Sequence, residues 1–385
     1  MTFPLNPLVR DTAAPAILET RAWLGGYDGA KGPAIDLSQA APPYAPPPDL
    51  LARLAKAAGS PDMARYGLVP GEPDLRDAYA EHLSQLYDGA IAAEEVSITA
   101  GCNQAFLIAA MLIAQRGDAL ILPAPWYFNH KMTLDMLGVE ARPLACTPAS
   151  GFLPDPARAE ALIDASVRAL VLVTPNNPTG AVYPSDLIAA FAALCRKRGI
   201  WLILDETYRD FLPEGVARPH ALLADGVGDG VLSLYSFSKS FALPGHRLSA
   251  MTHPAGLGPQ IVKIQDCVQI CPARPGQAAV AWGLRALGEW REEKRRLFNA
   301  QARSFAAAME RTAGWRIEAM GAYFAYLRHP HNSSALDVAK RLAVDNGLLM
   351  IPGSFFGPGQ DAHMRASFGN LSPEALADLP RRFGS

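Results

Sequence analysis

Cysteine is scarce in this sequence: the 385 residues include only five, an odd number, in no regular spacing. Small extracellular domains held by disulfides need more cysteines in an ordered pattern, so that class of protein is excluded. Cys267 and Cys271 lie four residues apart, but neither a second cysteine pair nor a histidine cluster completes a zinc site. We interpret all five as small packed residues in a reducing cytoplasm.

An excess of charge of one sign is also lacking. Lysine and arginine total 35, aspartate and glutamate total 37, and the net charge is −2, so the composition predicts neither a nucleic acid nor an anionic membrane as partner. Apolar runs such as residues 105–114 are too short to span a bilayer. Residues 1–7 combine neither a basic region nor an apolar stretch, so we expect no secretory signal and a cytoplasmic protein.

The length and the order of the patterns predict two domains, because 385 residues exceed what one core usually organises. Between about residues 96 and 251, short apolar runs alternate with helical segments, which predicts a large α/β domain with a mostly parallel sheet flanked by helices. A smaller α+β domain is expected after it. The predicted division is an N-terminal segment joining the small domain (1–45), a large domain (46–283) and a small domain (284–385).

The pattern also predicts individual elements of the smaller domain and its connections. Residues 42–48 are rich in proline, which indicates an extended linker. A long charged helix over residues 285–311 is expected to lead into the small domain. A strand over 322–327, a helix over 335–346 and a strand over 348–351 are expected within it.

The residues around Lys239 are the most informative feature. A strand-like run at residues 231–235 leads into Ser-Phe-Ser-Lys at residues 236–239, and Gly245 and Arg247 follow. A lysine that forms a Schiff base must lose its proton, which a neighbouring cation favours. Hydroxyls, backbone N–H groups and a guanidinium suit a phosphate. Pyridoxal 5'-phosphate (PLP) requires both, so the pattern favours a PLP site over a surface Ser-Lys pair.

Asp205 follows another buried strand-like run, residues 200–204, about one βαβ unit before Lys239. A buried carboxylate is costly unless it meets a cation, and the protonated pyridine nitrogen of PLP is such a cation. Tyr208, three residues later, could donate to the phenolic oxygen of the ring. Taken alone, Asp205 could also be a helix N-cap after a strand.

Two further junctions follow strand-like runs. Residues 169–173 lead into 174–180, where two prolines and a glycine predict a rigid turn that would aim an asparagine amide at the ring oxygen. Residues 96–99 lead into a small-residue turn and an apolar helix through Ile113, a combination that can bind an anion. Each signal is weak alone, since such turns are frequent.

Together these residues give the sequence a resemblance to the class I and II aminotransferases, a family of fold-type I PLP enzymes. The resemblance covers nearly the whole chain and is carried by residues 66–71, 177–180, 205–208, 236–239 and 364–368. It implies an enzyme that moves an amino group between an L-α-amino acid and a 2-oxo acid by ping-pong chemistry. It also implies a homodimer with shared active sites.

The resemblance implies a role for each matching residue. Lys239 would form the aldimine with PLP and shuttle the proton, Asp205 would pair with the pyridine nitrogen, and Asn177 and Tyr208 would contact the ring hydroxyl. The phosphate would be held by Ser236, Ser238, Arg247, the backbone of Gly101, Cys102 and Asn103, and Tyr66 reaching across from the neighbouring subunit. Arg365 would bind the substrate α-carboxylate, with Asn177, Ala40 and Tyr127 on the same side.

An aromatic ring stacked on the cofactor is expected from residues 125–128. Counting back from Gly138, where the next helix is expected to end, favours Tyr127 over Trp126, with core packing as the alternative for either ring.

Three positions bear on the substrate. Ala40 stands where relatives commonly have glycine, but only its backbone N–H is needed, so binding should survive. Asn103 stands where some aspartate-specific relatives carry a lysine for the second carboxylate. Arg274 is a candidate to replace that lysine, and a surface arginine between two prolines is an equal alternative. The amino donor therefore stays open.

Two other functions are compatible with parts of the pattern. The same PLP site could run carbon–sulfur β-elimination or decarboxylation, because these reactions share their first step with transamination. A PLP-sensing transcription regulator would need a DNA-binding domain before the first motifs, and residues 1–40 are neither basic nor long enough to form one.

Overall fold

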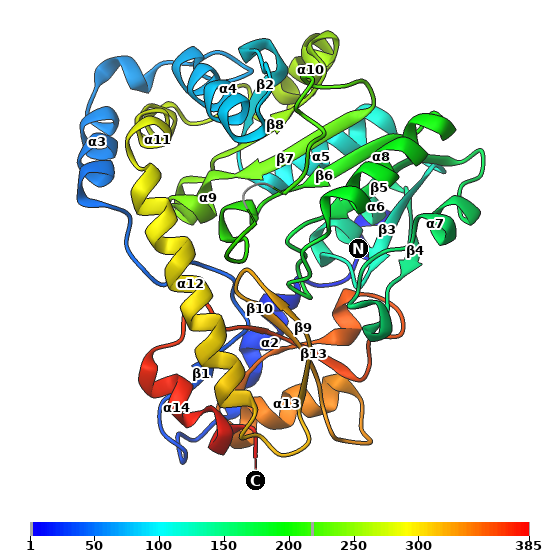
Figure 1. Ribbon diagram of the computed structural model, residues 1–385, viewed down its shortest axis with the longest axis vertical. Coiled ribbons are helices and arrows are strands. Elements are labelled where there is room, and N and C mark those ends of the chain that lie inside the picture. The colour runs from blue at the N-terminus through cyan, green and yellow to red at the C-terminus, as the bar shows by residue number, and fades with distance from the viewer. Residues whose placement is uncertain (1–2, 217–218, 385) are drawn as a thin grey trace.

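The computed structural model describes residues 3–216 and 219–384, and it has two parts joined by a long helix (Figure 1). One part is built on a large, mostly parallel sheet with helices around it. The other is built on a smaller antiparallel sheet. Helix α12 (Gly288–Met309), yellow in the figure, runs along one side of the molecule from the first part into the second.

The large sheet has seven strands within the described residues, in the order β2-β8-β7-β6-β5-β3-β4. Strand β8 is antiparallel to both of its neighbours, and the other neighbouring pairs are parallel. The apolar runs predicted as strands are confirmed. The strands are β2 (Val96–Thr99), β3 (Ala119–Ala124), β4 (Glu140–Ala145), β5 (Val167–Val173), β6 (Trp201–Asp205), β7 (Val231–Ser236) and β8 (Ser249–Thr252).

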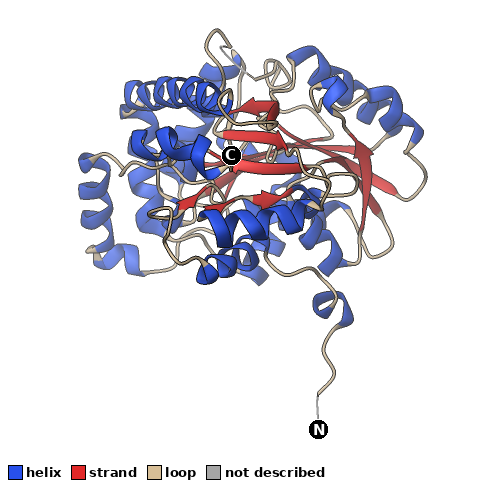
Figure 2. Cartoon of the chain, turned by 90° about the horizontal axis from the view of Figure 1, so that it is seen from below, coloured by secondary structure: helices blue, strands red, loops and turns tan. Residues whose placement is uncertain are grey.

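Both faces of this sheet are buried, which is why its central strands are continuously apolar. Successive side chains of a strand point to opposite faces, so Leu120 and Leu122 join one apolar cluster while Ile121 joins another. Helices cover the two faces and one end of the sheet (Figures 1 and 2). They are α3 (Pro48–Ala58), α4 (Pro73–Tyr87), α5 (Cys102–Ile113), α6 (Phe128–Leu137), α7 (Pro156–Ala161), α8 (Ser185–Arg198), α9 (Phe237–Ser240), α10 (Gly258–Val268) and α11 (Arg274–Ala286).

The smaller sheet has four described strands in the order β12-β13-β10-β9, all paired antiparallel. A separate parallel pair joins β1, near the N-terminus, to β11. These strands are β1 (Ile35–Asp36), β9 (Arg316–Gly321), β10 (Phe324–Arg328), β11 (Leu348–Leu349), β12 (Ile351–Pro352) and β13 (His363–Ser367). Their helices are α13 (Ala335–Asn346) and α14 (Pro373–Arg382).

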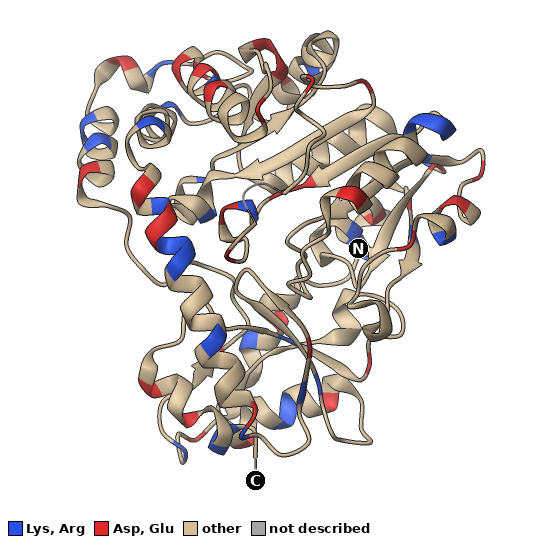
Figure 3. Ribbon diagram, in the orientation of Figure 1, with Lys and Arg blue, Asp and Glu red and all other residues tan. Residues whose placement is uncertain are grey.

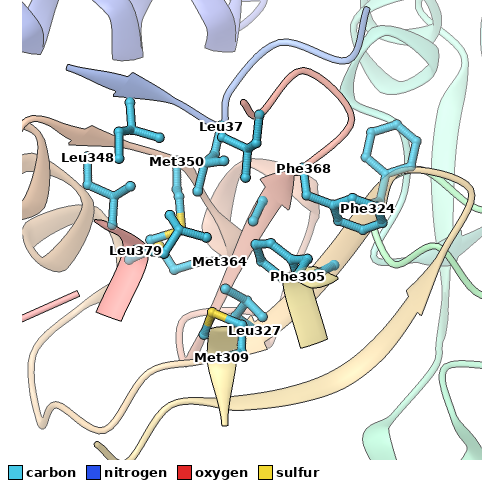
Figure 4. Packing of buried hydrophobic residues seen from close by; sticks show 14 of the residues in the cluster. Leu37, Phe305, Met309, Phe324, Leu327, Leu348, Met350, Met364, Phe368 and Leu379 are labelled. Carbon is cyan, nitrogen blue, oxygen red and sulfur yellow. The ribbon is translucent and has the colours of Figure 1, made fainter. Parts of the chain in front are cut away.

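The core of this part draws on residues far apart in the sequence. Figure 4 shows Leu37, from the N-terminal segment, packed near Met350 and Phe368, with Phe305 of α12 on the other side. The pairing of β1 with β11 and this shared core place Ile35, Asp36 and Leu37 with the smaller part. The assignment of all of residues 1–45 to the small domain stays a prediction. The division at about residue 283 stays a prediction.

Three expected elements differ from the structure. The helix predicted over 285–311 is confirmed as α12, but it starts later, at Gly288, because Ala286 ends α11 and Leu287 leaves helical geometry. The single strand predicted over 348–351 is wrong because its halves, β11 and β12, belong to different sheets. The strand predicted over 322–327 begins later, at Phe324, since Ala322 has a positive φ of 47°. The helix predicted over 335–346 is confirmed.

The N-terminal segment extends away from the body of the molecule (Figure 2). It carries α1 (Pro7–Arg10), which contacts α6, and α2 (Ala16–Trp23) follows and packs against α13 and β12 of the smaller part. Charged residues of both signs are interspersed on the helices and loops (Figure 3). Among the helices in the described ranges, none is both long and apolar enough to cross a bilayer.

Candidate active site

The predicted site residues lie where parallel strands of the large sheet end. Strands β2, β3, β5, β6 and β7 all point their carboxyl ends to the same edge, which is where open α/β sheets bind ligands. A cavity of ≈ 170 Å³ opens at this edge. It is lined by Cys102, Asn103, Tyr127, Val173, Asn177, Asp205, Thr207, Tyr208, Ser236, Ser238, Lys239 and Arg247.

Lys239 extends into the cavity from α9, directly after β7. Its Nζ donates a hydrogen bond to the carbonyl oxygen of Ala40 at 2.7 Å, so the N-terminal segment contributes backbone to the site. Burial, together with the nearby Arg247 and Arg365 guanidinium groups, lowers the pKa of Lys239 to about 8. About a tenth of this amine is therefore uncharged at pH 7, far more than for an ordinary lysine.

Asp205 lies at the end of β6 and is held by several groups. Its Oδ1 accepts a hydrogen bond from the backbone N–H of Thr207 at 2.9 Å, and its Oδ2 lies 3.2 Å from Nε2 of His130. The Cys102 sulfur lies 4.0 Å from Oδ1 and accepts a hydrogen bond from the Thr207 hydroxyl. This network fixes the orientation of a carboxylate that is only 3 % exposed.

His130 is a site residue that the sequence did not reveal. It belongs to α6, and its ring stacks on Phe106 of α5 with centroids 3.9 Å apart. The only local signal is its position three residues after Tyr127, one helical turn on. That spacing says nothing about Asp205, which is 75 residues away along the chain.

Arg365, on β13, approaches the cavity from the smaller sheet and is 1 % exposed. Its Nη1 donates to Oδ1 of Asn177 at 3.1 Å, and its Nη2 donates to the carbonyl oxygen of Ser38. A hydrogen bond also joins Asn177 to Tyr208. Burial lowers the pKa of Arg365 to about 10, so the guanidinium stays charged at neutral pH.

The turn between β2 and α5 forms a cradle for an anion. Gly101 has a φ of 90°, and a Cβ at this position would overlap the Arg247 guanidinium. The hydroxyls of Ser236 and Ser238 and the start of α5 face the same cavity. Hydroxyls, backbone N–H groups and a guanidinium are the donors that a phosphate prefers. Together with the Lys239 amine and the Asp205 carboxylate, this donor set fits PLP.

The two aromatic candidates occupy different positions. Tyr127 lines the cavity, with its ring edge toward His130 at 5.2 Å between centroids. Trp126 is 9 % exposed and packs in the core below the sheet edge, against Gly357. The geometry therefore favours Tyr127 for a ring in contact with a bound cofactor.

Tyr66 and Arg274 lie outside the cavity of their own chain. Tyr66 is 80 % exposed, which leaves its ring available to another subunit. Arg274 begins α11, where its guanidinium binds both oxygens of Glu72 at 3.0 and 3.2 Å and Asp62 at 3.2 Å. Its charge is therefore already matched within the chain.

Comparisons with known proteins agree with this geometry. The family model described as aminotransferase class I and II matches residues 33–383. The chain is 28% identical to an aromatic aminotransferase of Arabidopsis thaliana, over 88% of this chain and 85% of that protein. It is also 28% identical to a valine–pyruvate aminotransferase of Mycobacterium tuberculosis, over 94% of each.

Solved structures show the same fold. A Thermus thermophilus aspartate aminotransferase variant superposes with a TM-score of 0.91 at 24% identity, covering 99% of both chains. An aspartate aminotransferase from Rhizobium meliloti also gives 0.91, at 21% identity, covering 99% of this chain and 98% of that one. At such identities the likeness concerns the fold alone. The family match over most of the chain carries the assignment: this chain belongs to the class I and II aminotransferases, a PLP-dependent family, and is an aminotransferase.

Proposed function

We propose that this enzyme transfers an amino group between an L-α-amino acid and a 2-oxo acid in two half-reactions, with PLP bound in the cavity and Lys239 as its covalent anchor. The observation that carries the proposal is the position of Lys239 opposite Asp205 in one cavity, with its pKa lowered to about 8. A lysine that is already partly uncharged can attack a carbonyl carbon and can later accept a proton.

PLP, when bound, supplies an aldehyde that condenses with amines and a ring that accepts the electrons released from the substrate Cα–H bond. The chain provides the conditions for this chemistry. Asp205 presents a carboxylate that the Thr207 N–H and His130 hold in one orientation, so that it can pair with a protonated ring nitrogen. The adjacent Cys102 stays an uncharged thiol, because burial and Asp205 raise its pKa well above the usual value.

Lys239 then moves the proton. Once a substrate amine has replaced it, its Nζ is free on the same side of the cavity to take the proton from the substrate Cα and to return it elsewhere. Asn177 and Tyr208, which are hydrogen-bonded to each other, would contact the hydroxyl of the ring. Ser236, Ser238, Arg247 and the backbone at residues 101–103 would hold the phosphate.

Arg365 is the proposed site for the substrate α-carboxylate. Its guanidinium is buried, and its Nε has no hydrogen-bond partner among the described residues. A planar guanidinium binds a carboxylate through two parallel hydrogen bonds, which fixes the substrate Cα in one place. Asn177 and the backbone of Ala40 flank this position, and the Tyr127 ring would cover the cofactor.

The proposal includes a cytoplasmic homodimer in which Tyr66 completes the phosphate site of its partner. Support comes from the 80 % exposure of this tyrosine next to a glycine turn that belongs to the family pattern. Because Tyr66 does not line the cavity of its own chain, we expect its hydroxyl to contact the phosphate of the neighbouring subunit.

The test is a single-turnover experiment with purified, PLP-loaded enzyme and one amino acid at a time. A transaminase should release one 2-oxo acid per active site and then stop, keep the amino group, and resume only when a second 2-oxo acid is added. Continuous release of ammonia or carbon dioxide from one substrate would instead establish a lyase or a decarboxylase. The Lys239→Ala variant should retain PLP non-covalently and give no turnover, so appreciable transamination by it would contradict the role of Lys239.

A further inference from the structure

The charges around the cavity constrain which side chain the amino donor can carry. This inference rests on the proposed function, in which Lys239 and Arg247 serve the cofactor and Arg365 binds the α-carboxylate. The only cations that act on the Lys239 amine from the described residues are Arg247 and Arg365. In the proposed function, all three positive groups therefore bind the cofactor or the α-carboxylate, and none of them is left to bind a substrate side chain.

Two other arginines come from segments near the site, and each is already paired with anionic partners. Arg274 is bound by Glu72 and Asp62. Arg21, on α2, lies 3.2 Å from Oδ2 of Asp36 and also donates to Gln39. A second substrate carboxylate would have to displace one of these carboxylates to gain a cation.

Asp36, the ion-pair partner of Arg21, is linked to the proposed α-carboxylate site through Ser38. Its Oδ1 accepts hydrogen bonds from the N–H and hydroxyl of Ser38, at 2.7 and 2.5 Å, and the carbonyl of Ser38 in turn binds Arg365. The carboxylate lies close enough to raise the pKa of Arg365, against the larger effect of burial. Because Asp36 and Arg21 neutralise each other, this pair offers no net positive charge to a second substrate carboxylate.

The surface beside Arg365 is aromatic. The guanidinium carbon lies 5.4 Å from the ring centre of Phe356 and 5.5 Å from that of Phe324. Phe356 packs against Phe128, and Phe128 against Tyr127 at the cavity wall, with centroids 5.6 and 5.1 Å apart. Ile17 of α2 is partly buried against this cluster. Phe324 and Phe356 are fully buried, and Tyr127 is the ring of this cluster that lines the cavity.

We propose that the enzyme selects amino donors with large uncharged apolar side chains, aromatic or aliphatic, and discriminates against aspartate and glutamate. An apolar side chain gains by leaving water for a place beside Val173 and the Tyr127 ring, which line the cavity. A second carboxylate loses its hydration at the same place without an ion pair. We expect kcat/KM for phenylalanine or leucine to exceed that for aspartate by about 100-fold or more.

Binding of unreactive carboxylates tests this selectivity without turnover. Isothermal calorimetry on the PLP-loaded enzyme should show tighter binding of 3-phenylpropanoate than of succinate. Equal or tighter binding of succinate, or aspartate as the best donor in the half-reaction, would overturn the proposal. If no amino acid gives up its amino group, the proposed function fails, whereas the calorimetric comparison still decides the selectivity.

An added cation provides a second test. Asn103 lines the cavity on an exposed first turn of α5, so a longer side chain fits there. The Asn103→Lys substitution should raise the ratio of aspartate to phenylalanine kcat/KM, and tighten succinate binding, on the order of tenfold, as one charge-assisted hydrogen bond allows. The Asn103→Gln substitution, which lengthens the side chain without charge, should leave that ratio where it is. An equal change in both variants would contradict the charge argument.

Discussion

At the scale of single residues, the site is organised around the Lys239 amine. Its folded environment disfavours the protonated form of this amine. Lys239 is enclosed near two arginines, and the surrounding structure tolerates this because Ala40 accepts its hydrogen bond. The same crowding of cations that prepares the amine for reaction must destabilise the apoenzyme whenever the amine is protonated. Function and stability are therefore opposed at this position.

This opposition predicts a pH-dependent stability difference in the apoenzyme. The pKa of Lys239 is lowered from about 10.5 to about 8 in the folded state, so its destabilising effect is full below pH 8 and decreases between pH 8 and 10.5, where the unfolded state binds more protons. The Lys239→Met apoenzyme should thus be more stable than wild type at pH 7, on the order of 3 kcal/mol. Denaturant unfolding at several pH values should show the difference vanishing above about pH 10.5. A difference that does not depend on pH would contradict this account.

Gly101 gives a second prediction at the residue scale. An alanine there needs the positive φ of 90° and would overlap Arg247, so Gly101→Ala should weaken PLP binding on the order of tenfold or more. Gly117 has nearly the same φ, 91°, but open space around its Cβ position. Gly117→Ala should cost about 1–3 kcal/mol of stability and leave the PLP dissociation constant unchanged. Fluorescence titration of apoenzyme with PLP distinguishes the two.

The site residues that the sequence could predict are those with a recognisable pattern in the residues next to them along the chain. Lys239 and Asp205 each follow a strand-like run and share a segment with their polar partners. His130 was not predicted, and neither was the contact of Ser38 with Arg365, because these contacts join distant segments. The position of Arg274 could not be predicted for the same reason, since its partners Glu72 and Asp62 are about 200 residues earlier.

At the scale of elements, predictions from periodicity succeed inside an element and fail at its ends. Strand β7 and helix α13 have patterns that packing reinforces, and both were predicted closely. The residues on both sides of the break between α11 and α12 have a helical sequence pattern. Gly288, a residue that disfavours the helix interior, is the one local indication of the break. Strands β11 and β12 are consecutive apolar residues, and only the tertiary partners, β1 for one and β13 for the other, separate them.

Glu206, which follows Asp205 at the end of β6, is a buried carboxylate that contacts side chains from several elements. Glu206 is fully buried, accepts hydrogen bonds from Ser233 of β7 at 2.6 Å and from Tyr87 of α4, and lies 3.2 Å from His220 and 3.6 Å from Arg209. Glu206→Gln should destabilise the protein by about 3–5 kcal/mol, because it leaves the buried Arg209 guanidinium without its counter-charge. Glu214 pairs with Arg303 on the surface, and Glu214→Gln should change stability by less than about 1 kcal/mol.

The same carboxylate predicts acid sensitivity. Burial alone would raise the pKa of Glu206, but His220 and Arg209 lower it to about 2. Because the folded pKa is depressed, its contribution is complete above about pH 4.5 and is lost as the pH falls toward 2. The stability difference between wild type and Glu206→Gln should therefore shrink over that range in urea unfolding experiments. A constant difference down to pH 2 would show that Glu206 is not the titrating group.

At the scale of the whole molecule, the site is assembled from three distant parts of the chain. The large sheet supplies Lys239 and Asp205, the smaller sheet supplies Arg365, and residues 36–40 bring backbone carbonyls to both. The pairing of β1 with β11 fixes that N-terminal segment beside β13. Any motion of the smaller part relative to the large sheet would move the proposed α-carboxylate site and its N-terminal cover together, which suits a site that must exclude water during reaction.

The proposed homodimer adds a fourth part, and mixing two inactive variants tests it. If Tyr66 acts across the subunit boundary, a heterodimer of a Lys239→Ala subunit and a Tyr66→Ala subunit contains one intact site. Half of the dimers in an equimolar, refolded mixture are heterodimers, so about a quarter of wild-type activity should return at limiting PLP.

A matched control separates this outcome from action within one chain. Wild-type subunits mixed with subunits carrying both substitutions produce heterodimers without an intact site if Tyr66 acts on its partner, because the one remaining Lys239 then lacks its tyrosine. Activity should fall to about a quarter of wild type in that mixture, from the wild-type homodimers alone. If Tyr66 instead served its own chain, the first mixture would recover nothing and the control would keep about half. The 80 % exposure of Tyr66 in the single chain favours the first result, because the ring is open to a partner and does not line its own cavity.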